Sequence, residues 1–143
     1  PAVRLGLDRV KGLSAEAGAR VAAARAARPF VDVTDLARRA GLDRGAVRAL
    51  SRAGALASLA GHRHHAAWAA LGIEAPLAVL PEARIREAAP LLRRPGEGED
   101  IVADYAHLGF TLGRHPLALL RERLRRQHCV TAAELAQSEP GTR

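Results

Sequence analysis

A glycine-centred turn followed at once by a helical run restricts the fold of this chain more than any other feature. Residues 10–14 read Val-Lys-Gly-Leu-Ser, and residues 15–27 are rich in alanine, with Ser14 in position to cap the helix. This order predicts two short helices joined by a tight turn, a helix-hairpin-helix. Such a turn directs backbone N–H groups and a helix N-terminus at one point, an arrangement that binds a phosphate and reads no base.

A second unit of the same kind is predicted farther along the first half. Its turn spans residues 54–61, and the helix over residues 62–71 carries Trp68 inward, while Val47 and Leu50 precede the turn as core positions. One pair of helices buries too little apolar surface to be stable alone. We therefore expect both units to pack around one shared core.

After residue 71 the composition changes. Prolines and a Gly-Glu-Gly-Glu run mark a linker, with one short helix near residues 81–88. A later helix is expected to bury a stripe made by Leu117, Leu120 and Leu124. The predicted fold is all-α: a tandem helix-hairpin-helix domain over residues 1–71, a Pro/Gly-rich linker over residues 72–99, and a small helical appendage over residues 100–143.

The distribution of charge indicates nucleic acid as the partner. The chain holds 22 Lys and Arg residues against 15 Asp and Glu, a formal net charge of +7. Residues 1–71 hold 12 of the basic and 5 of the acidic residues, whereas residues 72–143 hold 10 of each. The whole excess therefore lies in the half that contains both hairpins, as is typical of nucleic-acid-binding chains. A solvated basic surface without a ligand gives the same count and stays open as the alternative.

Composition sets the class of protein. Aromatic residues make up only 3% of the chain and much of the apolar content is alanine, which favours a thin helical core. The single cysteine, Cys129, excludes an intramolecular disulfide and suits a reducing cytoplasm. No apolar run has the length of a membrane span, and no signal peptide pattern occurs. We expect a cytoplasmic segment of a longer bacterial protein, with no membrane partner, because the chain starts at Pro1 and contains no methionine.

The predicted DNA-binding residues lie in the two turns and at the start of the helices that follow them. They are Lys11, Gly12, Leu13, Ser14 and Arg20 in the first unit, and Gly54, Ser58, Gly61, His62 and Arg63 in the second. We expect both turns on one face, where they contact phosphates across one groove. The alternative is that the second turn only packs the core, because it lacks the Gly-apolar-Gly frame that is common in such hairpins.

Catalytic and metal chemistry are not predicted for this chain. His62 and His65 can share a helix face, but no third ligand lies near them in the sequence, so phosphate contact fits this cluster better than zinc. The acidic residues of the first half stand at predicted helix starts, where capping explains them. They do not supply the clustered carboxylates that two-metal phosphoryl transfer requires. We predict no catalytic residue, no metal site and no cofactor.

Several segments resemble the tandem helix-hairpin-helix region of bacterial C-family DNA polymerases, which include the replicative polymerase III alpha subunit and its error-prone relative. In the first half these segments are residues 3–7 (VRLGL), 10–13 (VKGL), 29–30 (PF) and 50–59. In the second half, residues 104–105 (DY) and 109–117 (GFTLGRHPL) are similar to the segment before the family's OB-fold, in a form closer to the error-prone branch. Ser14 and Glu16 depart from the usual hairpin, which affects the first DNA contact and not the fold.

The resemblance implies a function. The family's palm, thumb and fingers, with the metal-binding aspartates, precede such a segment, and its tandem hairpins hold the duplex behind the active site. This chain is then a duplex clamp that binds double-stranded DNA independently of sequence, within an error-prone translesion DNA polymerase that serves damage-induced mutagenesis. The parent protein is expected to be a Mg²⁺-dependent DNA-directed DNA polymerase, with an inactive Y-family polymerase-like adaptor and a RecA-like accessory protein as partners.

Two other functions remain open. The chain fits a protein-docking module of the same polymerase, because tandem hairpins can lose DNA binding and keep a docking surface. It also fits the hairpin module of a repair nuclease or helicase, although the segment His115-Pro116 argues against this. Salt separates the first two functions, since a DNA clamp loses affinity steeply as salt rises and an apolar docking surface does not.

Overall fold

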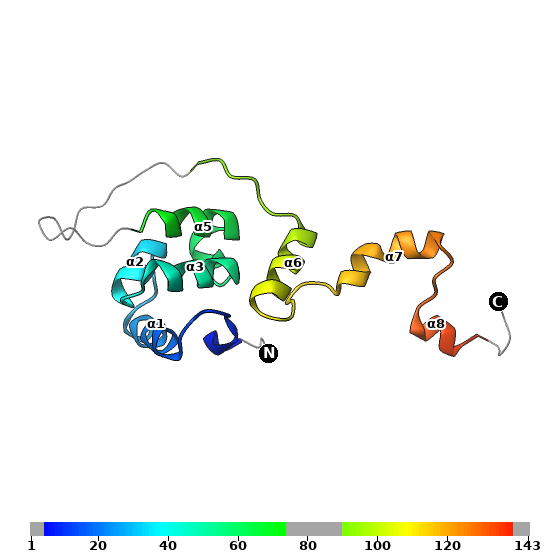
Figure 1. The fold of residues 1–143 in the computed structure, drawn as a ribbon, viewed down its shortest axis with the longest axis horizontal. Helices are drawn as coiled ribbons and strands as arrows, with labels where there is room; N and C mark the ends of the chain where they lie inside the picture. Colours follow the sequence, from blue (N-terminus) through cyan, green and yellow to red (C-terminus); the bar gives the residue numbers. More distant parts are fainter. Residues whose placement is uncertain (1–4, 74–89, 139–143) are drawn as a thin grey trace, which may run out of the picture.

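The computed structural model describes residues 5–73 and 90–138, and within these ranges the chain contains helices and irregular segments but no strand. This confirms the predicted all-α fold. The predicted short helix near residues 81–88 lies outside the described residues. The elements in chain order, shown in Figure 1, are η1 (Leu7–Arg9), α1 (Ala15–Ala27), α2 (Val33–Arg39), α3 (Arg44–Arg52), α4 (Ala57–Ala60), α5 (Arg63–Leu71), α6 (Glu97–His107), α7 (Pro116–Arg126) and α8 (Ala132–Ala136).

Side-chain caps begin the first three α-helices. The Ser14 hydroxyl accepts a hydrogen bond of 3.1 Å from the backbone N–H of Ala17 in α1. The carboxylates of Asp32 and Asp43 accept in the same way at the starts of α2 and α3, each at 2.7 Å. A cap of this kind contributes about 1 kcal/mol to helix stability. The helix starts expected at Ser14 and at the acidic residues are confirmed.

Two glycines in left-handed conformation make the predicted turns possible. Gly12 has a φ of +83° in the first turn, and Gly54 has a φ of +69° directly after α3. A residue with a side chain is strained in this region by roughly 1–2 kcal/mol. The turn at Gly54 is closed by the Ala55 N–H, which donates to the Leu50 carbonyl oxygen at 3.0 Å. The local sequence thus fixes both turns.

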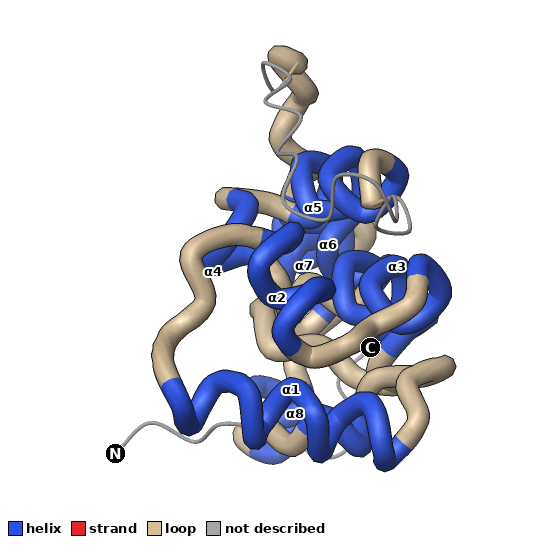
Figure 2. The backbone as a smooth tube through the Cα atoms, turned by 90° about the vertical axis from the view of Figure 1, so that its left-hand side faces the viewer, coloured by secondary structure: helices blue, strands red, loops and turns tan. Residues whose placement is uncertain are grey.

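Residues 5–73 share one core. It is built from η1 and α1–α5, and Val47, Leu50 and Leu56 are at most 2% exposed. In Figures 1 and 2, α1 lies along the base of this group, with α2 and α3 between α1 and α5. The shared core and the inward positions of Val47 and Leu50 are therefore as predicted.

Trp68 does not face inward, and that prediction is wrong. Its side chain is 44% exposed, whereas Ala66 and Ala70 on the same helix are 0% and 2% exposed. Two residues along a helix correspond to nearly opposite faces, so a helix that buries Ala66 and Ala70 turns Trp68 outward. The small alanines let α5 lie close to α3, and this packing decides which face of α5 is covered.

Helix α6 packs against α3 and joins the second half of the chain to the hairpin core. It begins at Glu97, three residues before the start expected from the sequence. The Gly96 N–H donates to the Glu99 carboxylate at 2.7 Å, which closes the first turn of the helix. Ile101 and Asp104 are the buried residues of this helix.

Helices α7 and α8 extend to one side of the rest of the chain (Figure 1). Leu117 and Leu120 of α7 are each 46% exposed, so the expected burial of the leucine stripe is wrong. The stripe exists at helical spacing, but no element in the described ranges covers it. None of the helices in residues 5–73 and 90–138 is both long and apolar enough to cross a membrane.

Candidate nucleic-acid interface

The first hairpin turn, helix α3 and the end of α6 surround a shallow hollow of about 250 Å³. Its lining includes three side chains that are cationic at neutral pH, and no carboxylate belongs to it among the described residues. Such a surface attracts an anion. We call it the basic hollow, and its lining residues are Lys11, Gly12, Gly45, Arg48, Ala49, Arg52 and His107.

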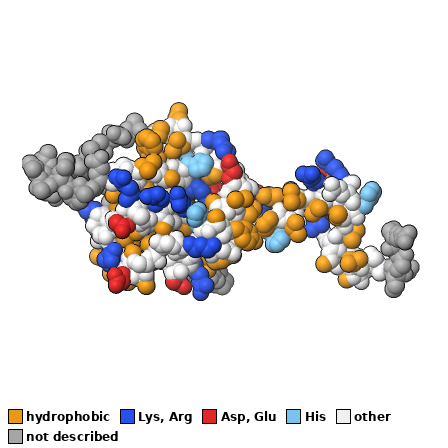
Figure 3. Space-filling model, viewed as in Figure 1, with side chains coloured by type: hydrophobic (Ala, Val, Ile, Leu, Met, Phe, Trp, Pro, Cys, Tyr) orange, Lys and Arg blue, Asp and Glu red, His pale blue; other side chains and the backbone are white. Residues whose placement is uncertain are grey.

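A stripe of arginines on α3 supplies most of this charge. Arg44, Arg48 and Arg52 follow one another at intervals of four residues, which places them on one face of the helix. All three are exposed, and Figure 3 shows a band of Lys and Arg side chains over α3. Arg44 donates to the Ile73 carbonyl oxygen at 3.2 Å. The side chains of Arg48 and Arg52 have no ion-pair or hydrogen-bond partner within the described part of the chain, so their charge is available to a ligand.

Lys11 both lines the basic hollow and caps α6. Its Nζ donates to the carbonyl oxygen of Ala106 at 3.0 Å and to that of Tyr105 at 3.5 Å. The backbone N–H of Lys11 also donates to the His107 carbonyl oxygen at 3.0 Å. The last carbonyl groups of a helix lack intrahelical partners and carry negative partial charge, so a lysine is stabilising there. The hairpin turn therefore fixes the end of α6 beside the hollow.

The backbone of the turn is less free to bind an anion than the sequence predicted. The N–H groups of Lys11 and Leu13 both have protein acceptors, namely the carbonyl oxygens of His107 and Val10. Gly12 still leaves the turn without a side chain, at a position where an added Cβ would lie 3.9 Å from the Ala49 Cβ. The anion affinity of the hollow consequently depends on side-chain cations more than on a cluster of free N–H groups.

The other predicted residues of the first unit have structural partners. Ser14 caps α1, and Leu13 packs against the core. Arg20 donates from Nε to the Ala40 carbonyl oxygen at 2.9 Å and from Nη2 to the Gly41 carbonyl oxygen at 3.2 Å, which caps the end of α2. The structure thus brings Lys11 and Gly12 to the hollow and uses Leu13, Ser14 and Arg20 to hold the hairpin.

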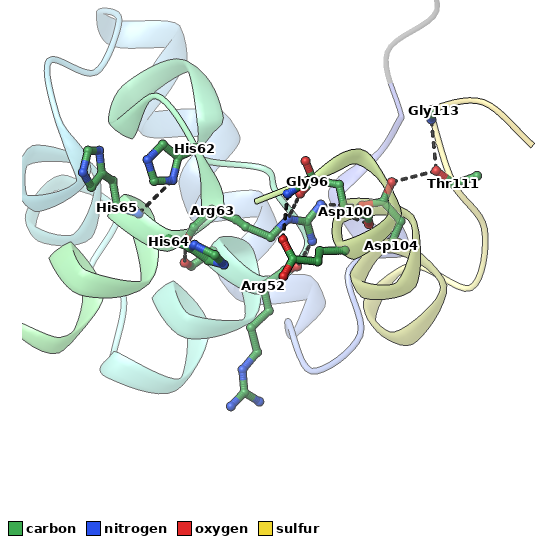
Figure 4. A network of polar contacts seen from close by, with 12 residues as sticks. Arg52, His62, Arg63, His64, His65, Gly96, Asp100, Asp104, Thr111 and Gly113 are labelled. Carbon is green, nitrogen blue, oxygen red and sulfur yellow. Dashed lines mark hydrogen bonds and ion pairs between the residues drawn. The ribbon is translucent and has the colours of Figure 1, made fainter. Parts of the chain in front are cut away.

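Arg63, predicted to contact phosphate, points instead toward α6. Its side chain is 13% exposed, with Nε 2.5 Å from Asp100 Oδ1 and Nη2 2.7 Å from Asp104 Oδ1. Nη1 donates to the Arg52 carbonyl oxygen at 2.8 Å. Figure 4 shows Arg63 between α5 and α6, whereas the Arg52 side chain points away from this network. Arg63 therefore ties α3, α5 and α6 together.

The remaining residues of the second unit also lie apart from the hollow. His62 caps α5, and Gly54 lies beneath the Arg63 guanidinium. Partial desolvation and the neighbouring His65 and His64 lower the pKa of His62, which makes it a weak anion ligand at neutral pH. The lining of the basic hollow thus includes none of Gly54, Ser58, Gly61, His62 and Arg63. DNA contact by this set stays a prediction.

The carboxylates near the interface do not fit the Mg²⁺ expected for the parent polymerase. Asp32 and Asp43 cap helices, and Asp104 is bound by Arg63 and by the Thr111 hydroxyl at 2.9 Å. Asp35 departs from the capping expected of the acidic residues: Asp32 is the cap of α2, and Asp35 is buried and pairs with Arg28, Arg38 and Arg39. Burial opposes its ionisation, but the Val31 N–H and the arginines outweigh burial and lower the pKa of Asp35. Mg²⁺ requires carboxylates that are free to bind it.

Arg48, Arg52 and His107 line the basic hollow but are not among the residues predicted from the sequence. The spacing of Arg44, Arg48 and Arg52 was a readable signal, since four-residue intervals define one helix face. No local signal existed for His107, because the contact that brings α6 to the turn joins residues 95 positions apart.

Comparison with known proteins agrees with the hairpin geometry. Residues 1–66 match the family model described as a helix-hairpin-helix motif. The chain is 57% identical to the error-prone DNA polymerase of Alkalilimnicola ehrlichii over 99% of this chain and 14% of that protein. It is 56% identical to that of Aromatoleum aromaticum over 94% of this chain and 13% of the relative. A third, from Pseudomonas paraeruginosa, is 49% identical over 99% of this chain and 14% of its own length.

The chain therefore spans about 14% of the length of the curated relatives that it matches. A search of the solved structures found no match. Identity of about one half over nearly all of this sequence, with the hairpin match in its first 66 residues, shows that the chain is homologous to a segment of error-prone DNA polymerases that contains a helix-hairpin-helix motif.

Proposed function

We propose that this chain binds duplex DNA independently of base sequence, as the clamp of an error-prone translesion polymerase. The observation that carries the proposal is the position of Arg48 and Arg52, which line the same hollow as the Lys11-Gly12 turn. Helix-hairpin-helix motifs bind DNA, and DNA polymerases act on DNA. Both similarities therefore support DNA as the ligand of this chain.

The chemistry of the hollow suits a phosphodiester. An arginine guanidinium donates two parallel hydrogen bonds to a phosphate and stays charged at any physiological pH. The stripe from Arg44 to Arg52 covers eight helical steps, or roughly 12 Å, which corresponds to between three and four base pairs of B-DNA. Contacts to phosphates position a protein on the duplex but carry no base information. Such a grip lets a polymerase advance without favouring any sequence.

The wider role of the parent protein belongs to the same proposal. We assign it DNA synthesis across damaged template in the bacterial cytoplasm, with Mg²⁺ held outside this segment. An inactive Y-family polymerase-like adaptor and a RecA-like accessory protein are the proposed partners. The support for these assignments is the similarity to error-prone DNA polymerases rather than any residue of the hollow.

A titration of the 143-residue chain with labelled duplex tests the proposal. Fluorescence anisotropy would be recorded for two unrelated sequences over a series of salt concentrations. The variant Arg48→Gln/Arg52→Gln is expected to weaken binding equally for both sequences and to reduce the slope of log K against log salt by about 0.9 per lost phosphate contact.

Arg25→Gln is the matched control, because it removes one positive charge from an exposed residue of α1 that does not line the hollow. It is expected to bind like the wild type. Wild-type affinity in the double variant, or a loss confined to one sequence, would show that the hollow is not a sequence-independent clamp.

A protein-docking module is the second candidate, and the exposed leucines of α7 favour it. Leu117 and Leu120 form an apolar surface, and such surfaces mark protein contacts. Because the chain spans about 14% of its relatives, we assign this surface to another part of the polymerase. Leu117→Ser/Leu120→Ser is then expected to weaken that contact with little salt dependence and to leave duplex binding unchanged.

A further inference from the structure

His107 belongs to the basic hollow although it comes from the second half of the chain. It is the last residue of α6, it is half-buried, and it lines the hollow beside the Lys11-Gly12 turn. It also lines an adjoining hollow of about 130 Å³ with Arg52, Arg63 and His64. A side chain that lines the basic hollow is in position to meet an anion bound there.

The position of His107 is fixed by contacts along α6. Arg63 holds Asp100 and Asp104 by ion pairs of 2.5 and 2.7 Å. At the end of the helix, the backbone N–H of Lys11 donates to the carbonyl oxygen of His107 itself. Arg63 and Lys11 both belong to the part of the chain that forms the hairpin core. They hold α6, and with it His107, beside the hollow.

Cations surround His107 on the sides that face it. Lys11 approaches from the hairpin turn, Arg48 and Arg52 from α3, and Arg63, which is ion-paired with Asp100 and Asp104, from α5. The His64 imidazole also lines the smaller hollow. No carboxylate lines either hollow in the residues that the structure describes. Partial burial, followed by the charges of Arg52, Arg63 and Lys11, lowers the pKa of His107 below its usual 6.5. The imidazole is therefore mostly neutral near pH 7 while the hollow is empty of an anion.

A phosphate in the hollow reverses this balance. Its negative charge offsets the surrounding cations and offers an acceptor oxygen to the imidazolium. We infer that His107 is a further duplex-contacting residue, which takes up one proton from solvent when a DNA phosphate enters the basic hollow and then donates a hydrogen bond to that phosphate. This inference rests on the proposed duplex binding. It makes the segment after the linker part of the DNA interface and makes the grip tighter as pH falls.

The sign and size of the effect follow from linkage. DNA binding raises the pKa of His107, so affinity is constant above the bound pKa, rises as pH falls through the window between the two pKa values, and is constant again below the free pKa. The total gain is about tenfold in affinity for each unit by which DNA raises the pKa. Below the free pKa, the imidazolium also adds one phosphate contact, which steepens the salt slope by about 0.9.

The test measures duplex affinity of the 143-residue chain at about pH 5.5 and about pH 8, at constant ionic strength. The wild type is expected to bind more tightly at the lower pH, and His107→Gln is expected to lose most of that difference. His107→Lys, which carries a fixed charge, is expected to bind tightly at both values. His128→Asn is the control, because His128 is exposed outside both hollows and its φ of 60° suits asparagine.

A second readout follows the proton directly. The His107 imidazole would be titrated by NMR without DNA and with saturating duplex, and its pKa is expected to rise on binding. An unchanged pKa, or an unchanged pH dependence in His107→Gln while Arg48→Gln/Arg52→Gln still weakens binding, would overturn this inference and leave the proposed function intact. If the wild type binds no duplex at either pH, the proposed function itself fails.

Discussion

Lys11 Nζ lies 3.0 Å from the backbone carbonyl oxygen of Ala106, so the first hairpin turn holds the end of a helix that follows 95 residues later. One lysine thereby joins the turn that defines the motif to the segment after the linker. The same side chain lines the basic hollow. We therefore expect Lys11 to contribute to stability through its hydrogen bonds to α6, and to DNA binding through its charge in the hollow.

Lys11→Ala is expected to lower both quantities. Loss of the hydrogen bonds to the end of α6 should reduce the free energy of unfolding by about 0.5–1.5 kcal/mol, as measured by urea unfolding. Loss of one cation from the hollow should weaken duplex binding by the same factor for every sequence and make the salt slope shallower by about 0.9. A change confined to one sequence would mean that Lys11 reads bases.

Gly12 and Gly18 form a matched pair with opposite expected effects. Gly12→Ala places a side chain at a φ of +83° and should destabilise the chain by roughly 1–2 kcal/mol. Gly18 is inside α1, and an added Cβ would lie 3.6 Å from the Leu7 Cβ, an ordinary contact. Gly18→Ala should therefore stabilise by roughly 0.5–1 kcal/mol. Thermal unfolding of both variants checks the signs, and equal effects would refute the left-handed turn.

The start of α6 is expected to weaken in acid through Glu99. Hydrogen bonds from Arg93 and from the Gly96 N–H lower the pKa of Glu99 to about 2 from an ordinary value of 4.5. A lowered folded-state pKa gives stability that is present above 4.5 and is lost as pH falls toward about 2. Glu99→Gln should thus destabilise the chain at neutral pH, and the difference from wild type should shrink across that window. Glu122→Gln, at an exposed pair 3.9 Å from Arg126, is the control.

Local features of this fold were readable from the sequence, because local chemistry decides them. Ser14 caps α1 through an N–H three residues away, and the left-handed turn requires glycine at position 12. Helical spacing also showed that Leu117 and Leu120 share a face, but spacing does not say whether another element covers that face. Helix α5 packs its small residues Ala66 and Ala70 inward against the core, so Trp68 lies on the exposed face.

The lining of the basic hollow was only half predictable for the same reason. Lys11 and Gly12 were found from the turn, whereas the partners of Arg63 are 37 and 41 positions away and leave no trace in its neighbouring sequence. An arginine at a helix start looks the same in sequence whether it meets a phosphate or a buried aspartate. The three-dimensional contact decides between these roles.

Arg63 and Asp104 give the sharpest test of that distinction. Arg63→Met removes the partner of a carboxylate whose side chain is 12% exposed, and breaking a buried pair costs about 3 kcal/mol or more. Urea unfolding should show this loss, and Arg63→Met/Asp104→Leu should recover much of it because no buried charge is left unpaired; Asp100, which also loses Arg63, is 41% exposed and stays hydrated. Duplex affinity of the folded double variant should fall no further than that of His107→Gln, since neither residue lines the basic hollow and only the placement of His107 depends on the Arg63 ion pairs. A large loss of duplex affinity with little loss of stability would instead return Arg63 to the DNA-binding surface.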